Sequence, residues 1–383
     1  MRATERQHLT GASHAEIRPQ RHDSPLTPPL SLSACVCRAG SFPARDRQMF
    51  HKALTEVRHR LPDEITFNYY TDRQSPWLLA NLMPETTTVR AVRQTRWAKL
   101  LDRPAVKPLV ARSGGMLVRS DVSQLAHADV YDLDRIAGKA LCGALETLWQ
   151  EVWQDYLVTF TTYGLGQGWQ CEQISREGGN LVLQLGFPTD HAALMGRFLD
   201  PETRWKFEEL NHPVRGEGRP TLAWARLDLD LDRGEALIEE VQSDWLRLVA
   251  YEVTSLRARS PQNRNLRAHQ DYMRALFARY AKVWPKVVML ATLHVLCDHL
   301  GMRRVWMHRP EAGAWFKGME QDDAPRSLYM DLPKSFCFEP VSEIPDMLRL
   351  GPWNRNQRLA RQRMRPVKAM MQNGYPVFWR LDL

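Results

Sequence analysis

The sequence contains no uninterrupted apolar run of about 18 residues or more, which is the length that a membrane-spanning helix needs. Its first residues also lack the apolar core of a secretory signal peptide. The 6 cysteines are scattered, and none forms a Cys-x-x-Cys pair. Scattered cysteines in a chain of this size are typical of reduced thiols. These absences predict a cytoplasmic protein without a membrane span.

Residues 1–48 have no hydrophobic period and are rich in proline, serine and arginine. Such a segment cannot bury enough apolar surface to offset its own ordering entropy, so we predict a disordered leader. A second interpretation is that translation starts at Met49, where a structured pattern begins. The chain as a whole is 44% hydrophobic and has 13 tryptophans, which indicates a globular protein with a substantial core.

The net charge of +8 and the isoelectric point near 9.3 favour an acidic partner, such as nucleic acid or a nucleotide cofactor. High-GC bacterial genomes encode arginine-rich proteins, which are basic whether or not they have such a partner. The positive charge is densest in residues 346–383, which we interpret as a basic tail. Its arginines could follow a nucleic-acid backbone, or they could form a solvated helix face. They are Arg355, Arg358, Arg361, Arg363 and Arg365.

Hydrophobic periodicity divides the chain before this tail into two regions. In residues 49–204 it predicts an α+β region with a short helix at 50–60, a strand at 65–70, a helix from Asp134 to Leu157, strands at 158–170 and 180–187, and a helix at 194–210. In residues 205–345 it predicts an α/β domain with a β-hairpin (222–245), helices at 246–258 and 266–300, a strand at 303–308, a helix or turn at 322–332 and a strand at 335–341. Residues 375–381 predict one last strand. The fold class is therefore α+β, with a mixed sheet whose central hairpin is flanked by helices.

The second strand of the hairpin is unusually polar, because LIEEVQSDW (237–245) sets five acidic, amide or hydroxyl side chains within six positions. A three-residue turn would pair Leu229 with Leu237, Arg226 with Glu240 and Trp224 with Gln242. We prefer this register to that of a two-residue turn, because it joins apolar to apolar residues and gives one carboxylate a guanidinium partner. A buried Arg226–Glu240 pair could simply fix the sheet. The number of polar groups favours a functional site on the sheet face instead.

Several segments together resemble a domain of phage and mobile-element proteins, the large polyvalent-protein-associated domain with an "EEIQSDW" strand. The similar segments are LDLDLDRGEALIEEVQSDW, KVWPKVVMLATLHVLCDHLGMRRVWM and LYMDLPKSFCF, and the resemblance covers about residues 205–340. It implies a bacterial mobile-element association, but no reaction. Its matching positions lead us to predict a substrate-binding role for six residues: Arg226, Gln242, Ser243, Asp244, Trp245 and, before the first strand of the hairpin, His212.

The order hairpin, helix, strand, helix, strand is similar to the second half of the GNAT acyltransferase fold. That resemblance implies N-acyl transfer from acyl-CoA to an amine, with a glutamate on the acidic strand as the general base. Glu240 is the first choice and Glu239 the second, and Tyr329 is the expected acid for the thiolate leaving group. The family's glycine-containing pyrophosphate loop should follow this strand, but SDWLRLVAY (243–251) has no glycine.

Two other functions fit parts of the pattern. Asp228 on one strand and Glu240 on the next resemble the Mg²⁺-binding hairpin of restriction-endonuclease-like nucleases. A non-catalytic module that binds nucleic acid or protein would use the basic tail instead. His294, Cys297 and His299 crowd one helix, but their spacing does not predict that they converge on one zinc ion. GLGQG (164–168) lacks a following helix, so we interpret it as a turn rather than a phosphate loop.

Overall fold

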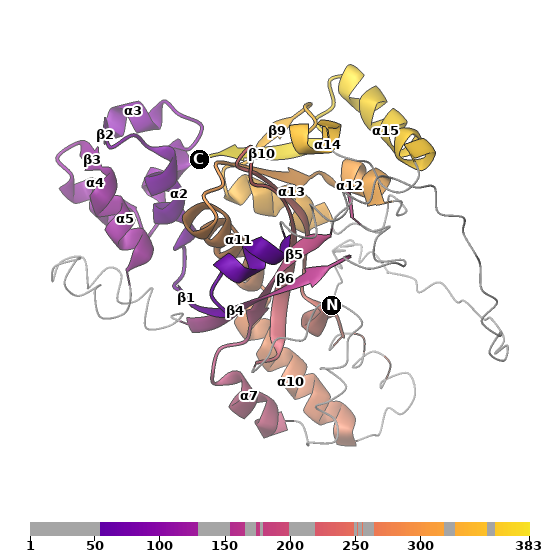
Figure 1. Ribbon diagram of the computed structural model, residues 1–383. Coiled ribbons are helices and arrows are strands. Elements are labelled where there is room, and N and C mark those ends of the chain that lie inside the picture. The colour runs from indigo at the N-terminus through magenta and orange to yellow at the C-terminus, as the bar shows by residue number, and fades with distance from the viewer. Residues whose placement is uncertain are drawn as a thin grey trace, which may run out of the picture. The chain divides into compact units, whose positions relative to one another are not determined.

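The computed structural model describes residues 54–128, 154–164, 174–176, 179–198, 219–248, 251, 255, 264–317, 326–350 and 357–383. Their central feature is a mixed sheet of eight strands in the order β1-β4-β5-β6-β7-β8-β10-β9 (Figure 1). The strands are β1 (Glu64–Tyr69), β4 (Gln154–Tyr163), β5 (Asn180–Gly186), β6 (Thr221–Asp230), β7 (Glu235–Gln242), β8 (Arg304–His308), β9 (Glu339–Val341) and β10 (Phe378–Asp382). A separate two-stranded sheet pairs β2 (Thr86–Thr88) with β3 (Met116–Val118).

Neighbouring strands of the large sheet are antiparallel except for β7 and β8, which run parallel. A parallel pair needs a crossover connection, and here α10 (Arg264–Tyr280) and α11 (Trp284–His294) lie between the two strands in the chain. The last strand, β10, inserts between β8 and β9. The crossover places β8 beside β7, and the insertion of β10 leaves β9 at the edge of the sheet.

The main hydrophobic core lies on one face of the sheet. Alternate residues of β6 and β7, including Ala225, Leu227 and Ile238, point into it and pack with the buried residues of α11. Helix α11 is apolar on all sides, and Val287–Leu293 are all buried, as expected for a helix enclosed in a core. After His294 the helix widens into a π-helical turn, η4 (Val295–His299).

The other face carries a smaller apolar cluster that includes Leu237, Trp306 and Phe378. Residues of α12 (Pro310–Lys317), α14 (Asp346–Leu350) and α15 (Gln357–Gln372) pack in this cluster (Figure 1). The polar side chains of the hairpin belong to this second face, because Arg226 and Asp228 alternate with the core residues of β6.

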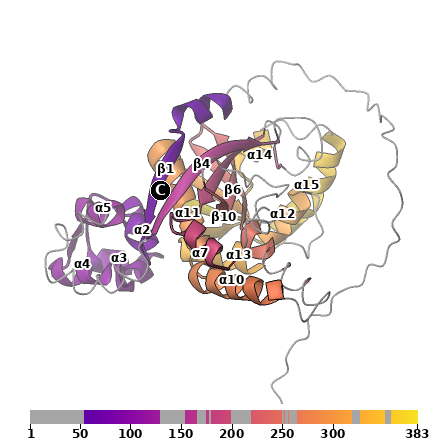
Figure 2. The same ribbon diagram turned by 90° about the horizontal axis from the view of Figure 1, so that it is seen from below.

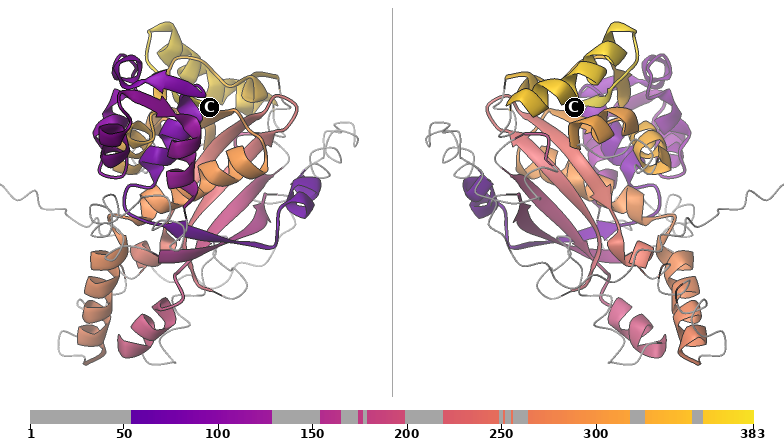
Figure 3. Two further views of the ribbon diagram at one scale, coloured as in Figure 1. Left: turned by 90° about the vertical axis from the view of Figure 1, so that its left-hand side faces the viewer. Right: turned by 90° about the vertical axis from the view of Figure 1, so that its right-hand side faces the viewer.

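The remaining helices form two groups at the margins. A cluster of short helices follows β1 (Figure 2): α2 (Gln74–Leu82), α3 (Val89–Arg93), the 3₁₀ helix η1 (Ala98–Asp102), α4 (Lys107–Arg112) and α5 (Arg119–His127). Helix α7 (His191–Phe198) lies beside α10 (Figure 3), and an Arg279–Asp190 ion pair of 2.7 Å links this region. Helix α13 (Arg326–Ser335) precedes β9.

The predicted fold class is confirmed: the chain is α+β, and helices flank a mixed sheet with the hairpin at its centre. The three regions that the sequence separates at about residues 205 and 346 all contribute strands to this one sheet. The predicted leader lies outside the described residues. No helix in the described part of the chain has the length and apolarity to cross a membrane.

Some predicted boundaries are wrong. The helix predicted to run to Leu157 cannot do so, because β4 begins at Gln154 and pairs with β1 and β5; the earlier part of that helix lies outside the described residues. The helix predicted at 266–300 is interrupted by a turn at 281–283, and Pro285 stands in the first turn of α11. The strand predicted at 335–341 is shortened to β9, because α13 continues to Ser335.

Candidate functional site

A β-bulge at Glu239 sets neighbouring acidic side chains on one face of the hairpin. Leu227 of β6 pairs with Ile238, but the preceding residue, Arg226, pairs with Glu240. Glu239 is therefore the extra residue of β7. A bulge interrupts the alternation of side chains, so Glu239 and Glu240 both point to the face that carries Arg226.

Two of the predicted cross-strand pairs are confirmed, namely Arg226 with Glu240 and Trp224 with Gln242. The third predicted pair is wrong, because Leu229 pairs with Ala236 and not with Leu237. The turn spans Leu231–Gly234, one residue more than predicted, and the bulge compensates for the difference farther along the strand. The sequence-based register is thus correct beyond the bulge and shifted by one residue before it.

Glu239 is 0% exposed, and its carboxylate is bonded from two sides. The backbone N–H of Ser175 donates to Oε1 at 2.9 Å, and the Ser175 hydroxyl donates to Oε2 at 2.8 Å. His308, at the end of β8, places Nε2 3.2 Å from the same Oε2 and 3.0 Å from the Ser175 hydroxyl. These bonds offset the cost of burying a carboxylate. Glu239 therefore fixes Ser175 and His308 inside the fold and cannot meet a dissolved substrate.

Glu240 differs from Glu239, because its side chain is 22% exposed while its partner Arg226 is 1% exposed. Arg226 donates to Oε2 of Glu240 through Nη2 at 2.6 Å and Nε at 3.1 Å. The Arg226 guanidinium also lies 4.5 Å from the centroid of the Tyr163 ring, within the range of a cation–π contact. Glu240 is thus a carboxylate that is paired on one side and accessible to solvent on another.

Asp244 is buried at the start of the helical residues 244–248. Its Oδ2 accepts a hydrogen bond from Trp224 Nε1 at 2.7 Å, and its Oδ1 accepts one from Arg247 Nη2 at 2.6 Å and another from Gln242. The predicted binding residues Gln242 and Asp244 therefore bond each other. A negative carboxylate stands at this helix start, where a phosphate group would otherwise benefit from the helix dipole.

Ser243 and Trp245 are bonded within the protein. The Ser243 hydroxyl donates to the backbone carbonyl of Leu222 at 2.6 Å. Trp245 is 2% exposed in the main core, where its Nε1 donates to the Tyr272 hydroxyl at 2.9 Å. Ser243 thus bonds β6, and Trp245 bonds α10. Neither side chain is bonded to Glu240 on the second face.

Tyr329 of α13 reaches the point where β7 and β8 separate. The β7–β8 ladder covers Glu235–Ile238 of β7, and beyond it the backbone N–H of Val241 donates to the Tyr329 hydroxyl at 3.2 Å. Burial raises the pKa of Tyr329, and the charge of Glu240 raises it further, so the phenol stays protonated at neutral pH. The structure thus brings Tyr329 to the backbone next to Glu240, although the two are far apart in the sequence.

The carboxylates of the predicted Mg²⁺ site share a face but hold separate partners. Asp228 is bonded by Arg176 at 2.6 Å, and Glu240 is bonded by Arg226. Burial raises the pKa of Asp228 to about 6, although the charge of Arg176 opposes this shift. Among the described residues, the group of His, Cys, Asp and Glu side chains with metal-ligand spacing lies elsewhere, at His127, His294 and Asp298. The nuclease hypothesis therefore stays a prediction.

The other predicted residues are only partly described. His212 and Arg355 lie outside the described residues. Arg358, Arg361 and Arg363 belong to α15, but their side chains are not described, whereas Arg365 is exposed. The GLGQG segment is described only at Gly164, which has a positive φ of 76°. Gly164 can therefore end β4 in a turn.

Three residues of the site were missed by sequence reasoning. Ser175 and Arg176 lie between the strands predicted at 158–170 and 180–187, where REGGN (176–180) predicts a turn. His308 is the last residue of a short apolar strand. Each meets the hairpin through tertiary contact, and neither hydrophobic period nor local spacing carries that information. His308 could have been noticed only because it is a polar residue at the end of the predicted strand RRVWMH, in a domain that also contains the polar strand LIEEVQSDW.

None of the known protein families, curated proteins or solved structures with which the chain was compared matches it. The resemblance to the phage and mobile-element domain therefore stays a prediction based on its quoted segments.

Proposed function

We propose that the chain is an N-acyltransferase that moves an acyl group from a thioester to an amine. In this proposal Glu240 is the general base and Tyr329 is the general acid. The observation that carries the proposal is the bond of the Tyr329 hydroxyl to the Val241 backbone N–H, which is next in the strand to the accessible carboxylate of Glu240. The order of a hairpin (β6–β7), helices (α10, α11), a strand (β8), helices (α12, α13) and a strand (β9) supports the proposal, because it is similar to the second half of the GNAT fold.

Each group has a role in the chemistry. Glu240, directly or through one water, takes a proton from the attacking amine as the C–N bond forms. The Val241 backbone N–H donates to the Tyr329 hydroxyl and so holds this acid in place. As the C–S bond breaks, Tyr329 gives its proton to the leaving thiolate. Glu240 is assigned as the base in preference to Glu239, because Glu239 is 0% exposed.

The binding of the donor departs from the GNAT pattern. A pyrophosphate would lie at the start of the helix after β7, but Asp244 places a carboxylate there. The negative charges of this carboxylate and of a diphosphate would repel each other. We therefore propose that the donor binds through its acyl and pantetheine portions and that this helix start does not hold its diphosphate.

Thiol release tests the proposal. The purified chain would be incubated with acetyl-CoA or with S-acetylpantetheine, which lacks the diphosphate, and with a panel of polyamines, lysine peptides and peptide N-termini. We expect amine-dependent release of free thiol from both donors. Glu240→Gln should lower kcat by about 10²- to 10⁴-fold, the usual contribution of a general base. Tyr329→Phe should lower kcat with less effect on KM.

Arg365→Ala is the matched control, because this exposed residue of α15 is not part of the proposed site. It should leave thiol release unchanged. An amine panel that elicits no thiol release from either donor would overturn the proposal. Equal rates for Glu240→Gln and the unaltered protein, both folded by circular dichroism, would overturn the assignment of the base.

A further inference from the structure

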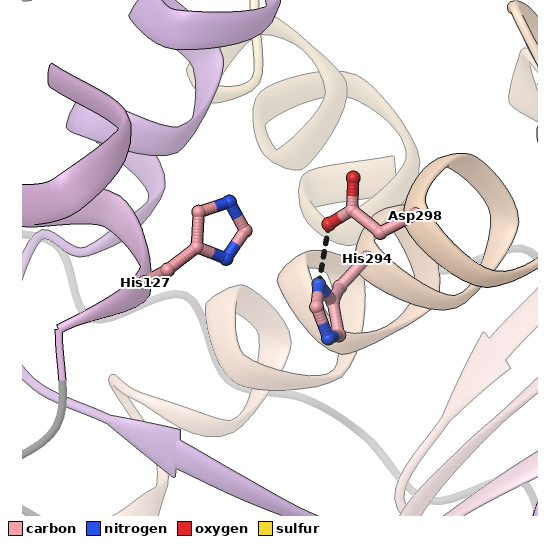
Figure 4. Close-up of side chains that lie close together, drawn as sticks. All are labelled: His127, His294 and Asp298. Atoms are coloured by element: carbon pink, nitrogen blue, oxygen red, sulfur yellow. Dashed lines mark hydrogen bonds and ion pairs between the residues drawn. The ribbon is translucent and has the colours of Figure 1, made fainter. Parts of the chain in front are cut away.

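A second group of polar side chains lies away from the hairpin, between the short helices and the end of α11. His127 is the last residue of α5, and His294 is the last residue of α11. Asp298 follows in the π-helical turn η4. Figure 4 shows the three side chains directed toward a common space, with His127 opposite the other two.

The three residues have metal-ligand spacing. Each offers one ligand atom, and these atoms all lie within 4.8 Å of one another. His294 Nδ1 and Asp298 Oδ2 are 2.5 Å apart and hydrogen-bonded, so a bound ion would replace the proton between them and separate the two atoms. The ring centroids of His127 and His294 are 5.9 Å apart. A zinc ion bound at about 2.0–2.1 Å to each ligand atom needs ligand atoms somewhat closer together than this upper limit. Rotation of the exposed His127 side chain can supply that adjustment.

The helix explains why two of the ligands converge. Residues four positions apart lie on the same side of a helix, and His294 and Asp298 have this spacing. The third ligand comes from a separate element, so the group is not a simple consequence of one helical surface. His299 is also near, with its ring centroid 5.2 Å from that of His294, but it does not belong to the group of three.

A neighbouring side chain orients the carboxylate. Trp77 of α2 donates from Nε1 to Asp298 Oδ2 at 3.2 Å. Hydrogen bonds of this kind hold metal-binding carboxylates in place. Trp77 is 1% exposed, so this support is rigid.

The nearby charge that opposes a bound cation is that of Arg73, whose Nε donates to the backbone carbonyl of Ala126 at 2.8 Å.

We propose that His127, His294 and Asp298 bind a divalent transition-metal ion, with Zn²⁺ as the representative and water in the remaining coordination position. Two imidazoles and one carboxylate suit Zn²⁺, Co²⁺ or Ni²⁺, whereas Mg²⁺ and Ca²⁺ prefer oxygen ligands alone. The ion would join α5 to the helix that packs on the sheet. This site is independent of the proposed acyl transfer.

Metal titration of the full-length, chelator-treated chain tests the proposal. Isothermal titration calorimetry with Zn²⁺ should show one more bound ion per chain for the unaltered protein than for His127→Ala or Asp298→Asn. Co²⁺ should give d–d absorption bands that both variants lose. The Asn side chain can still accept the hydrogen bond from Trp77, and His127 is exposed, so both variants should fold. Removal of a ligand should raise the Kd by more than the roughly 10- to 100-fold cost of losing a supporting partner.

His299→Ala is the matched control, because it removes an exposed imidazole from the same helix but not from the group of three. It should bind Zn²⁺ like the unaltered protein. Equal stoichiometry and equal Kd in the unaltered protein, His127→Ala and Asp298→Asn would overturn the proposal. So would loss of the Co²⁺ bands in His299→Ala together with their retention in His127→Ala.

Discussion

The acidic and amide side chains of LIEEVQSDW have different surroundings. Glu239 is enclosed with Ser175 and His308, and Asp244 begins a helix. Of the three carboxylates in LIEEVQSDW, only Glu240 combines a partner with access to solvent. The Arg226–Glu240 pair was predicted by matching charged and apolar partners across a three-residue turn, and it is correct because the bulge compensates for the longer turn. Sequence could not distinguish the two glutamates, because their exposure depends on segments that are remote in the chain.

The Arg226–Glu240 pair makes a prediction about stability. Arg226→Met should lower the free energy of unfolding by about 2–3 kcal/mol, because it leaves Glu240 without its guanidinium partner and removes the contact with Tyr163. This is less than the cost of breaking a fully enclosed pair, since Glu240 is 22% exposed. Urea denaturation followed by tryptophan fluorescence measures the change.

The double variant Arg226→Met/Glu240→Leu separates the pair from general packing at this position. Replacing both charges with apolar groups is often neutral, so the double variant should recover most of the lost stability. If the single variant costs less than about 0.5 kcal/mol, or if the double variant is no better than the single, the ion pair does not stabilise the sheet as described.

At the scale of elements, strand β5 occurs where the sequence predicts it, and α13 overlaps the segment predicted as a helix or turn at 322–332. The start of β4 was missed, because Tyr156 and its neighbours fit a helical period as well as a strand. What decides for the strand is pairing with β1 and β5, and that contact is tertiary. The bulge at Glu239 was missed for a similar reason, since no local signal marks an extra residue in a strand.

The turn between β6 and β7 makes an element-scale prediction. Gly234 has a φ of 62°, a left-handed conformation that costs most other residues about 1 kcal/mol. An added Cβ would meet its nearest atom, the Arg303 nitrogen, at 3.9 Å, so the cost comes from the backbone and not from a clash. Gly234→Ala should therefore lower the free energy of unfolding by about 1 kcal/mol.

Gly234→Asn is the informative comparison, because asparagine adopts this conformation more readily than alanine. It should lose less stability than Gly234→Ala in the same urea titration. If the two variants are equally destabilised, the left-handed backbone conformation at residue 234 is not the reason that glycine stabilises the turn.

At the scale of the whole molecule, one sheet combines strands from the entire described chain. β1 pairs with β4 across a long stretch of sequence, and the C-terminal β10 inserts between β8 and β9. The sequence indicated separate regions because the hydrophobic period changes along it, and this period does not reveal which distant strands pair. Such pairing joins the regions, so we expect the sheet to unfold as one cooperative unit.

The buried imidazole of His191 predicts how the stability of this unit depends on pH. His191 is stacked on Phe187 with ring centroids 3.5 Å apart, and its Nε2 lies 3.2 Å from the Tyr272 hydroxyl. Trp245 donates to that hydroxyl, so the hydroxyl can give its own proton to Nε2, which must then be unprotonated. Burial, and then the charge of Arg279, lower the pKa of His191 to about 3.

In the unfolded chain His191 should titrate at about 6.5. A pKa that is lower in the folded state means that the unfolded chain binds the proton first, so stability is present above about pH 6.5 and is lost as the pH falls toward 3. Between about pH 7 and pH 4.5 this amounts to about 2–3 kcal/mol. Asp228 acts in the opposite direction, because its raised pKa of about 6 adds stability as the pH falls.

The test therefore compares His191→Phe with the unaltered protein by urea denaturation across this range. The variant should be about 1 kcal/mol less stable at pH 7 through loss of the bond to Tyr272, and the difference should shrink and reverse toward pH 4.5. Parallel curves would show that His191 is protonated in the folded protein or that it titrates in the same way in both states.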